Sequence, residues 1–504
     1  MANSLRKTIA KNFSVLLAAQ IISMICSTVF VIMCARYLGD VRFGKYAFAG
    51  SFAMMFSSLG TLNLHAKAAR DVAQDRSRTL KYLSNLVPLT IILGGIVSVL
   101  SVITLLLMRR PTDLTILTII FSGTIIFQIM TTGLRWWFQA YQKLEYEALL
   151  VSVVSPLKLC LGLLVFALGG GLIPLAGIVV GVNFLVLVLA YSITKRNFSQ
   201  ISWEVDFQFW RKFIVKNIPF SLSLIFASIF GNIDKILLSM MKGDAVTGWY
   251  GAASQTLTPV KMIPGIFSMA MLPVFAEYYV THKKDFNRLI EKSIRYMLII
   301  VFPLAIAISL LAEKIMLLLF GPEFINGASA LSILAWAAAA TFVNMTVGKA
   351  IIGAGQEKLN AVFCGIGLAI NLSLNFLLIP SLAHVGASIS ILAAEGTITL
   401  LVLTWACRRA ALNIQIVSHL IKPAFATLSM GICIYLFRNY NLWLLIFLGT
   451  GIYFACLYLL KVFTEEEKTL MKRVLCVPRR RNLAEKINSS LKEEEFFLSL
   501  KKGG

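Results

Sequence analysis

The residues of this sequence that could do chemistry are charged side chains inside long apolar stretches. They are three bases and two acids, namely Lys158, Lys235, Lys261, Asp234 and Glu395. A charge at the centre of a membrane helix costs about 2.5–3.5 kcal/mol, so each needs a partner or a polar cavity. Because bases outnumber acids, a cavity that they line is net positive and suits an anionic substrate. For Asp234 and Lys235, a structural ion pair explains the sequence equally well.

Polar residues at helical spacing place two of these bases on polar stripes. Lys235 shares one face of its stretch with Asn232 and Ser239, and Lys261 belongs to a similar stripe in the next stretch. Lys158 and Lys261 each lie about 17 Å inside their helices at the rise of an α-helix. A polar stripe on a membrane helix faces a water-filled cavity or the bundle interior. We therefore expect these bases to line a central cavity.

A weaker internal repeat marks a second group of bases. Arg135 precedes Gln142 at the same spacing at which Lys349 precedes Gln356. We expect Arg135 and Lys349, together with Lys216, to lie at the cytoplasmic entrance of the cavity and to attract an anion. The alternative is that Arg135 and Lys349 only extend their charges to the membrane surface.

No motif typical of an enzyme or of a metal site occurs. The sequence has no P-loop, no G-x-S-x-G elbow and no H-E-x-x-H pair. Its 8 cysteines form no C-x-x-C pair, and its 4 histidines lie far apart. We therefore expect neither a metal site nor a disulfide framework. The expected protein is not an enzyme and needs no cofactor.

The composition predicts a membrane protein. Of 504 residues, 58% are hydrophobic and 14% are charged, whereas soluble domains contain about 25% charged residues. The 47 Lys and Arg residues exceed the 24 Asp and Glu residues and give a net charge of +23. Cytoplasmic loops of membrane proteins accumulate Lys and Arg. The excess therefore does not indicate a nucleic-acid partner.

We predict an all-α polytopic bundle of about fourteen transmembrane helices, each long enough to cross about 30 Å of hydrocarbon. The expected helices lie at about 13–35, 46–64, 84–107, 114–138, 147–168, 172–194, 213–241, 249–275, 294–320, 327–353, 359–379, 384–407, 419–437 and 441–462. The first stretch is full length and has no cleavage site, so we expect it to be retained. Basic residues concentrate in alternate loops, which predicts that both termini are cytoplasmic.

A duplicated turn indicates an internal repeat. Residues 39–46 read GDVRFGKY and residues 243–250 read GDAVTGWY, so both follow G-D-x-x-x-G-x-Y. With an even number of helices between them, both turns lie outside. The second glycine suits a tight turn and the tyrosine suits interfacial depth. We interpret the repeated residues as structural; they are Gly39, Asp40, Gly44, Tyr46, Gly243, Asp244, Gly248 and Tyr250.

The repeat defines the expected domains. They are an N-terminal lobe at 1–194, a cytoplasmic linker at 195–212, a C-terminal lobe at 213–410, two further helices at 411–462 and a cytoplasmic tail at 463–504. The two lobes are pseudo-symmetric, with about six helices each, as in transporters built from parallel repeats. The charged, aromatic linker is expected to include a helix on the membrane surface.

Short segments, in a characteristic order, resemble a known family. They read CARYLGDVRFGKYAFAGSF, IPFSLS, NIDKILLS, GWYGAA, LPVF and GASI. This order resembles bacterial polysaccharide flippases of the O-antigen (Wzx) type, within the multidrug/oligosaccharidyl-lipid/polysaccharide exporter superfamily. The resemblance implies a two-lobed bundle in the bacterial cytoplasmic (inner) membrane, with a cleft that opens alternately to each side.

The resemblance also implies a substrate. Such flippases move undecaprenyl-pyrophosphate-linked oligosaccharide repeat units from the inner to the outer leaflet, for O-antigen, capsule or exopolysaccharide synthesis. They use no ATP, and coupling to H⁺ or Na⁺ stays open. The basic cavity suits this task, because Lys and Arg compensate a pyrophosphate in low dielectric. Besides membrane lipid, a polysaccharide polymerase and a chain-length regulator are expected partners.

Other functions stay open. A lipid II flippase also has a basic cavity and a similar set of helices. A cation-coupled multidrug exporter needs acidic residues for its cationic cargo, and the surplus of bases here speaks against it. A scaffold that transports nothing is a third class, which buried charges on polar stripes do not favour.

Overall fold

The structure is a computed structural model that describes the chain except for residues 1, 63, 142, 198–204, 411–414 and 463–504. The described residues form α-helices and two short 3-10 helices, and they contain no strand. The α-helices are α1 (Ala2–Thr61), α2 (Leu64–Gln74), α3 (Thr79–Leu107), α4 (Thr112–Ala140), α5 (Leu144–Ala167), α6 (Leu172–Asn197), α7 (Phe207–Lys242), α8 (Asp244–Thr256), α9 (Thr258–Thr281), α10 (Lys283–Leu310), α11 (Ala312–Phe320), α12 (Gly327–Gly353), α13 (Glu357–Ala410), α14 (Gln415–Leu436) and α15 (Leu442–Leu459). The 3-10 helices are η1 (Arg76–Arg78) and η2 (Pro322–Phe324).

The predicted all-α membrane fold is confirmed. Among the described residues, 11 helices are long and apolar enough to cross a membrane. Two of them, α1 and α13, are each interrupted by one non-helical residue, at Gly39 and Ala383, so each covers two predicted spans. The described part of α14, Ile421–Leu436, is a shorter apolar helix. The count of about fourteen crossings stays a prediction.

Two predicted spans are each divided in the structure. The span predicted at 249–275 becomes α8 and α9, which meet at Leu257. Pro259, in the first turn of α9, has no backbone N–H to continue the ladder of α8. The span predicted at 294–320 becomes α10 and α11, which meet at Leu311.

The helix expected on the membrane surface within the linker stays a prediction, and the structure shows where the next helix begins. The Oδ1 atom of Asp206 accepts a hydrogen bond from the backbone N–H of Phe209 at 2.9 Å and begins α7 as its N-cap. Residues 207–212 are therefore the first turns of α7. The predicted tail at 463–504, Gln142 and residues 198–204 of the linker lie outside the described residues.

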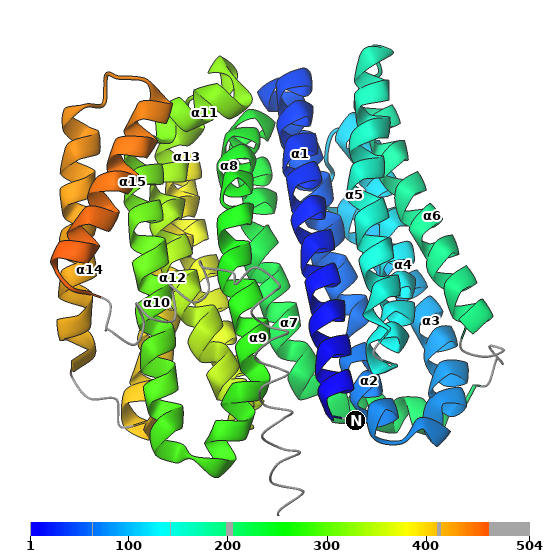
Figure 1. The fold of residues 1–504 in the computed structure, drawn as a ribbon. Coiled ribbons are helices and arrows are strands. Elements are labelled where there is room, and N and C mark those ends of the chain that lie inside the picture. Colours follow the sequence, from blue (N-terminus) through cyan, green and yellow to red (C-terminus); the bar gives the residue numbers. More distant parts are fainter. Residues whose placement is uncertain (1, 63, 142, 198–204, 411–414, 463–504) are drawn as a thin grey trace, which may run out of the picture.

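The helices form two groups that meet along α1, α7 and α8. Figure 1 shows α1–α6 on one side and α7–α15 on the other, with α14 and α15 at the far edge. Helix α1 packs against α7 and α8 as well as against α4 and α5. One apolar core, which includes Phe30, Phe43, Tyr250, Phe324 and Leu331, joins the two groups. The predicted residue boundaries of the lobes stay predictions.

The two repeated turns lie at the same end of the bundle and have the same backbone conformation. Gly39 has φ 74° and ψ 174°, and Gly243 has φ 89° and ψ 179°. This region is open to glycine and strained for other residues. The tight turn expected at the second glycine of each motif is wrong, because Gly44 and Gly248 lie within α1 and α8 and the first glycines make the turns. We call this end of the bundle the turn end. The opposite end, with α2 and the start of α7, is the linker end.

Candidate functional site

The repeated turns contact each other through their second glycines. A Cβ atom on Gly44 would lie 1.7 Å from the backbone oxygen of Asp244, and one on Gly248 would lie 2.2 Å from the backbone oxygen of Asp40. Only residues without a side chain allow this approach. The contact is reciprocal, as expected for repeats related by a pseudo-two-fold axis. We call these four residues, together with Trp249, the turn clasp.

The aspartates of the clasp each bind a residue from the other group of helices. The indole Nε1–H of Trp249 donates to Oδ2 of Asp40 at 3.0 Å. Asp244 lies 3.7 Å from the guanidinium of Arg110 and accepts a hydrogen bond from Ser239 at 2.7 Å. Arg110 also donates to the hydroxyl of Ser239 at 2.6 Å. The clasp therefore combines close backbone packing with polar contacts in both directions.

Two arginines that sequence reasoning missed strengthen the turn end. Besides Arg110, Arg36 of α1 donates to the backbone oxygens of Leu318 and Leu319, the latter at 2.8 Å. These oxygens belong to the last turn of α11, where a cation is favourable. Their position in the sequence was the only available signal. Arg36 lies shortly before the first repeated turn, and Arg110 follows an apolar stretch.

Asp234 is held by neutral donors. The hydroxyl of Tyr250 donates to its Oδ2 at 2.7 Å, and the amide of Asn375 donates to its Oδ1 at 2.7 Å. No ion pair between Asp234 and Lys235 occurs among the ion pairs of the described residues. The side chain of Tyr250 is only 2% exposed, and the hydroxyl that it donates satisfies a buried carboxylate. Its interfacial depth stays a prediction.

The first-turn tyrosine has a different environment. Tyr46 packs edge-on against Phe121, with ring centroids 5.4 Å apart. It also lines a cavity of about 230 Å³ between the two groups of helices. Lys235 lines the same cavity, with Gln128 and Gln255. The repeat therefore places Tyr46 at this cavity, whereas Tyr250 belongs to a buried hydrogen-bond cluster beside a second cavity.

Lys261 and Glu395 lie together in a second cavity, of about 150 Å³. The carboxylate of Glu395 accepts hydrogen bonds from Thr341 at 2.8 Å and from Asn344 at 2.5 Å. Glu395 is 7% exposed. The structure thus brings one predicted base and one predicted acid into a shared polar space, where the acid is held in place by two neutral donors.

Lys158 lies on the face of α5 that packs against α1. Ser155, one helical turn before it, has its hydroxyl 2.6 Å from the hydroxyl of Ser23. Gly162, one turn after it, lies against the ring of Phe30. Residues at these spacings share one helix face. Lys158 makes no hydrogen bond or ion pair with another described residue, and it does not line the cavities of Lys235 and Lys261.

The predicted entrance residues do not form one group. Arg135 pairs with Glu147 at 2.8 Å, and Gln139 donates to the same carboxylate at 3.0 Å. Sequence reasoning missed this pair, although its residues flank the short turn between α4 and α5. Lys349 lies in α12. Gln356, the other residue of the same repeat, accepts a hydrogen bond from Trp405 at 2.8 Å. Lys216 lies elsewhere, in a polar pocket at the linker end.

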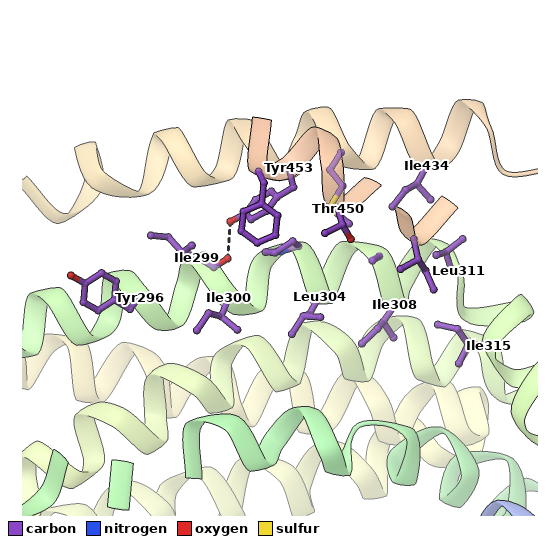
Figure 2. A pocket seen from close by; sticks show the side chains of 15 residues that line it. Tyr296, Ile299, Ile300, Leu304, Ile308, Leu311, Ile315, Ile434, Thr450 and Tyr453 are labelled. Atoms are coloured by element: carbon purple, nitrogen blue, oxygen red, sulfur yellow. Dashed lines mark hydrogen bonds between the residues drawn. The ribbon is translucent and has the colours of Figure 1, made fainter. Parts of the chain in front are cut away.

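A large apolar cavity, of about 740 Å³, lies between α10, α14 and α15 (Figure 2). Its walls are almost entirely aliphatic and aromatic, and they include Ile300, Leu304 and Ile434. The hydroxyl of Tyr453 is not available to the cavity, because it donates to the backbone oxygen of Ile299 at 2.7 Å. Sequence reasoning missed this cavity, since α14 and α15 lie outside the repeat and carry no polar pattern.

Comparisons with known proteins agree with this architecture. The family model described as polysaccharide biosynthesis protein matches residues 9–279, and the MatE model matches residues 219–377. The chain is 22% identical over 385 residues to the capsular polysaccharide biosynthesis protein CapF of Staphylococcus aureus, covering 76% of this chain and 95% of CapF. It is 27% identical over 212 residues to an uncharacterised membrane protein of Methanocaldococcus jannaschii, covering 41% of this chain and 42% of that protein, so the match spans less than half of that relative.

The fold is also that of a solved flippase. The lipid II flippase MurJ, in an inward closed conformation, aligns with a TM-score of 0.72 and 15% sequence identity. The alignment covers 92% of this chain and 99% of MurJ. At this identity the likeness establishes a shared fold.

Proposed function

Because this chain belongs to the polysaccharide biosynthesis protein family and has a flippase fold, we propose that it translocates undecaprenyl-pyrophosphate-linked oligosaccharides by alternating access. The turn clasp is the observation that carries the proposal. It joins the two groups of helices at the turn end through close glycine packing and polar contacts, next to the apolar core that both groups share. Such a contact can separate as a unit and close again, which alternating access requires.

The proposed orientation places the turn end outside the cell. The loops at the linker end are richer in Lys and Arg, and such loops stay in the cytoplasm. In this orientation both termini are cytoplasmic, and the structure is closed toward the outside. The membrane would be the bacterial cytoplasmic (inner) membrane.

The buried bases support an anionic cargo. Lys235 and Lys261 line cavities between and within the groups of helices, while Asp234 is occupied by Tyr250 and Asn375. These neutral donors leave the charge of Asp234 in place, so three bases face two acids, and Glu395 shares its cavity with Lys261. We propose that this positive surplus, with Lys158 on the first lobe, compensates the pyrophosphate as it crosses. Coupling to H⁺ or Na⁺ would involve Glu395.

The apolar cavity supports a lipid-linked cargo. Its apolar lining between α10, α14 and α15 suits an isoprenoid tail, which enters it from the equally apolar bilayer. A soluble cationic drug needs neither such a cavity nor a surplus of bases. The expected partners remain membrane lipid, a polysaccharide polymerase and a chain-length regulator.

Lipid II transport is the second candidate, and the likeness to the MurJ fold favours it. Both cargos share a polyprenyl pyrophosphate, so the sugar distinguishes them. The test is reconstitution of the purified chain in vesicles that carry either lipid. We expect the oligosaccharide lipid to become reachable by an impermeant lectin on the opposite leaflet. Transport of lipid II alone would establish the second candidate, and transport of neither by folded protein would exclude both.

A further inference from the structure

A polar pocket of about 470 Å³ lies at the linker end, where α2 and α3 meet the start of α7. Four lysines line it, namely Lys67, Lys81, Lys212 and Lys216. In the part of the chain that the structure describes, none of them has a carboxylate within ion-pairing distance. Like charges around one hollow repel each other unless an anion joins them.

The two acids of the pocket are engaged in holding the backbone and a neighbouring ring. Asp71 accepts a hydrogen bond from the hydroxyl of Tyr82 at 2.7 Å. Asp206 accepts one from the backbone N–H of Phe209 at 2.9 Å, as the N-cap of α7. Both carboxylates help to build the pocket walls and offset two of the four lysines, so the pocket keeps a positive surplus and the ammonium donors stay accessible to a ligand.

Aromatic rings give these walls a fixed shape. The Nζ atom of Lys67 lies 5.3 Å from the ring centroid of Phe213, and that of Lys81 lies 5.8 Å from the ring centroid of Phe209. Tyr82 packs edge-on against both rings, at 5.6 and 5.2 Å. Cation–π contacts hold an ammonium group near the rings while leaving its N–H donors accessible.

We propose that this pocket binds a phosphate group, carried by an anionic phospholipid or by a soluble phosphate ester. Phosphate oxygens accept several charge-assisted hydrogen bonds, and ammonium groups from separate helices surround them well. The donors come from α2 and α3 on one side and from α7 on the other. Bound phosphate therefore ties the first group of helices to the start of the second. This site goes beyond the transport proposed above and is separate from the cavities of Lys235 and Lys261.

The first test measures binding of inorganic pyrophosphate to the purified full-length chain by calorimetry at constant ionic strength. The Lys67→Gln/Lys216→Gln variant should bind about a hundredfold more weakly, since each lost charge-assisted hydrogen bond removes about a tenfold factor. The matched control is Lys292→Gln/Lys358→Gln, which removes two exposed lysines outside the pocket. The Lys67→Arg/Lys216→Arg variant keeps both charges and should retain most of the affinity, which separates loss of charge from misfolding.

The second test identifies the source of the phosphate. The same variants are placed in nanodiscs of phosphatidylcholine, or of phosphatidylcholine mixed with phosphatidylglycerol, and their thermal unfolding is compared. If phosphatidylglycerol stabilises the wild type and the control but not the pocket variant, the site binds a lipid headgroup. Stabilisation by pyrophosphate alone assigns it to a soluble ester. Absence of binding to the wild type, or equal losses in the pocket variant and its control, would overturn the proposal.

Discussion

Gly44 in α1 lies directly against the backbone oxygen of Asp244 in α8, and Gly248 in α8 lies in the same way against Asp40 in α1. A methyl group at either position would overlap a backbone atom of the opposite turn. Since the two turns come from different groups of helices, one added carbon atom acts on the contact between the groups. This makes the clasp accessible to a simple mutational test.

Gly44→Ala and Gly248→Ala should each open the turn end. The overlap cannot be relieved by a side-chain rotation, because the obstructing atoms are backbone. We expect greater labelling of a cysteine at Gln255, in the cavity behind the clasp, by an impermeant thiol reagent in a cysteine-free background. Transport should fall while the protein still inserts.

Gly123→Ala is the matched control for the clasp, because a Cβ atom there meets nothing within 4 Å. In a helix interior this change is neutral or stabilises by about 1 kcal/mol. Its labelling should equal that of the parent. Parent-like labelling and transport in both clasp variants would show that the turns do not form a gate.

The repeated tyrosines allow a second matched comparison. Tyr250→Phe removes a donor from the buried carboxylate of Asp234 and should cost about 1–3 kcal/mol of stability. Tyr46→Phe, at the equivalent position, removes a hydroxyl that makes no hydrogen bond to another described residue, and it should cost little stability. Thermal unfolding of the purified variants measures both. Equal losses in the two variants would contradict the assignment of Tyr250 to the Asp234 cluster.

The sequence predicted the all-α membrane fold and the positions of the two turns, because apolar length and a short motif are local signals. It did not predict that the turns touch. The motifs GDVRFGKY and GDAVTGWY do not indicate that the two turns contact each other. The contact of Gly44 with Asp244 depends on packing between helices that are distant in the sequence. The pairing of Arg135 with Glu147 was missed because Glu147 was treated as the membrane boundary.

Arg135 offers a test between pairing and substrate attraction. Arg135→Ala alone leaves the 6%-exposed carboxylate of Glu147 without its cation, and loss of such a partner costs about 3–5 kcal/mol. Arg135→Ala/Glu147→Ala should recover much of that stability. If Arg135 also attracts the anionic substrate at the cytoplasmic entrance, the double variant will be stable but will export poorly. Full export by Arg135→Ala/Lys349→Ala would exclude the entrance role.

The deep lysines should matter for export more than for folding. Lys158→Ala and Lys261→Ala are expected to abolish surface polysaccharide while membrane levels stay near those of the parent. Lys→Arg variants should keep partial activity, because the charge survives although the geometry changes. Lys292→Ala is the control. Abundant protein with unimpaired export would refute the proposed role of these lysines, and loss of the protein itself would indicate a structural role.

Binding at the linker-end pocket should weaken in alkaline solution earlier than an ordinary lysine site. Lys67 lies in α2, outside the candidate membrane spans, and its pKa is lowered, first by desolvation and then by the charge of Lys216, against a smaller opposing effect of Asp71. An anion needs the protonated form, so affinity falls as the pH rises through this lowered pKa. Inorganic sulfate is a suitable probe because its charge stays constant over that range. Lys216→Gln removes a like charge and should move the midpoint to higher pH, although it also weakens binding. The control Lys292→Gln should leave the midpoint of the pH dependence unchanged. If Lys216→Gln also left it unchanged, Lys67 and Lys216 would not share one anion site.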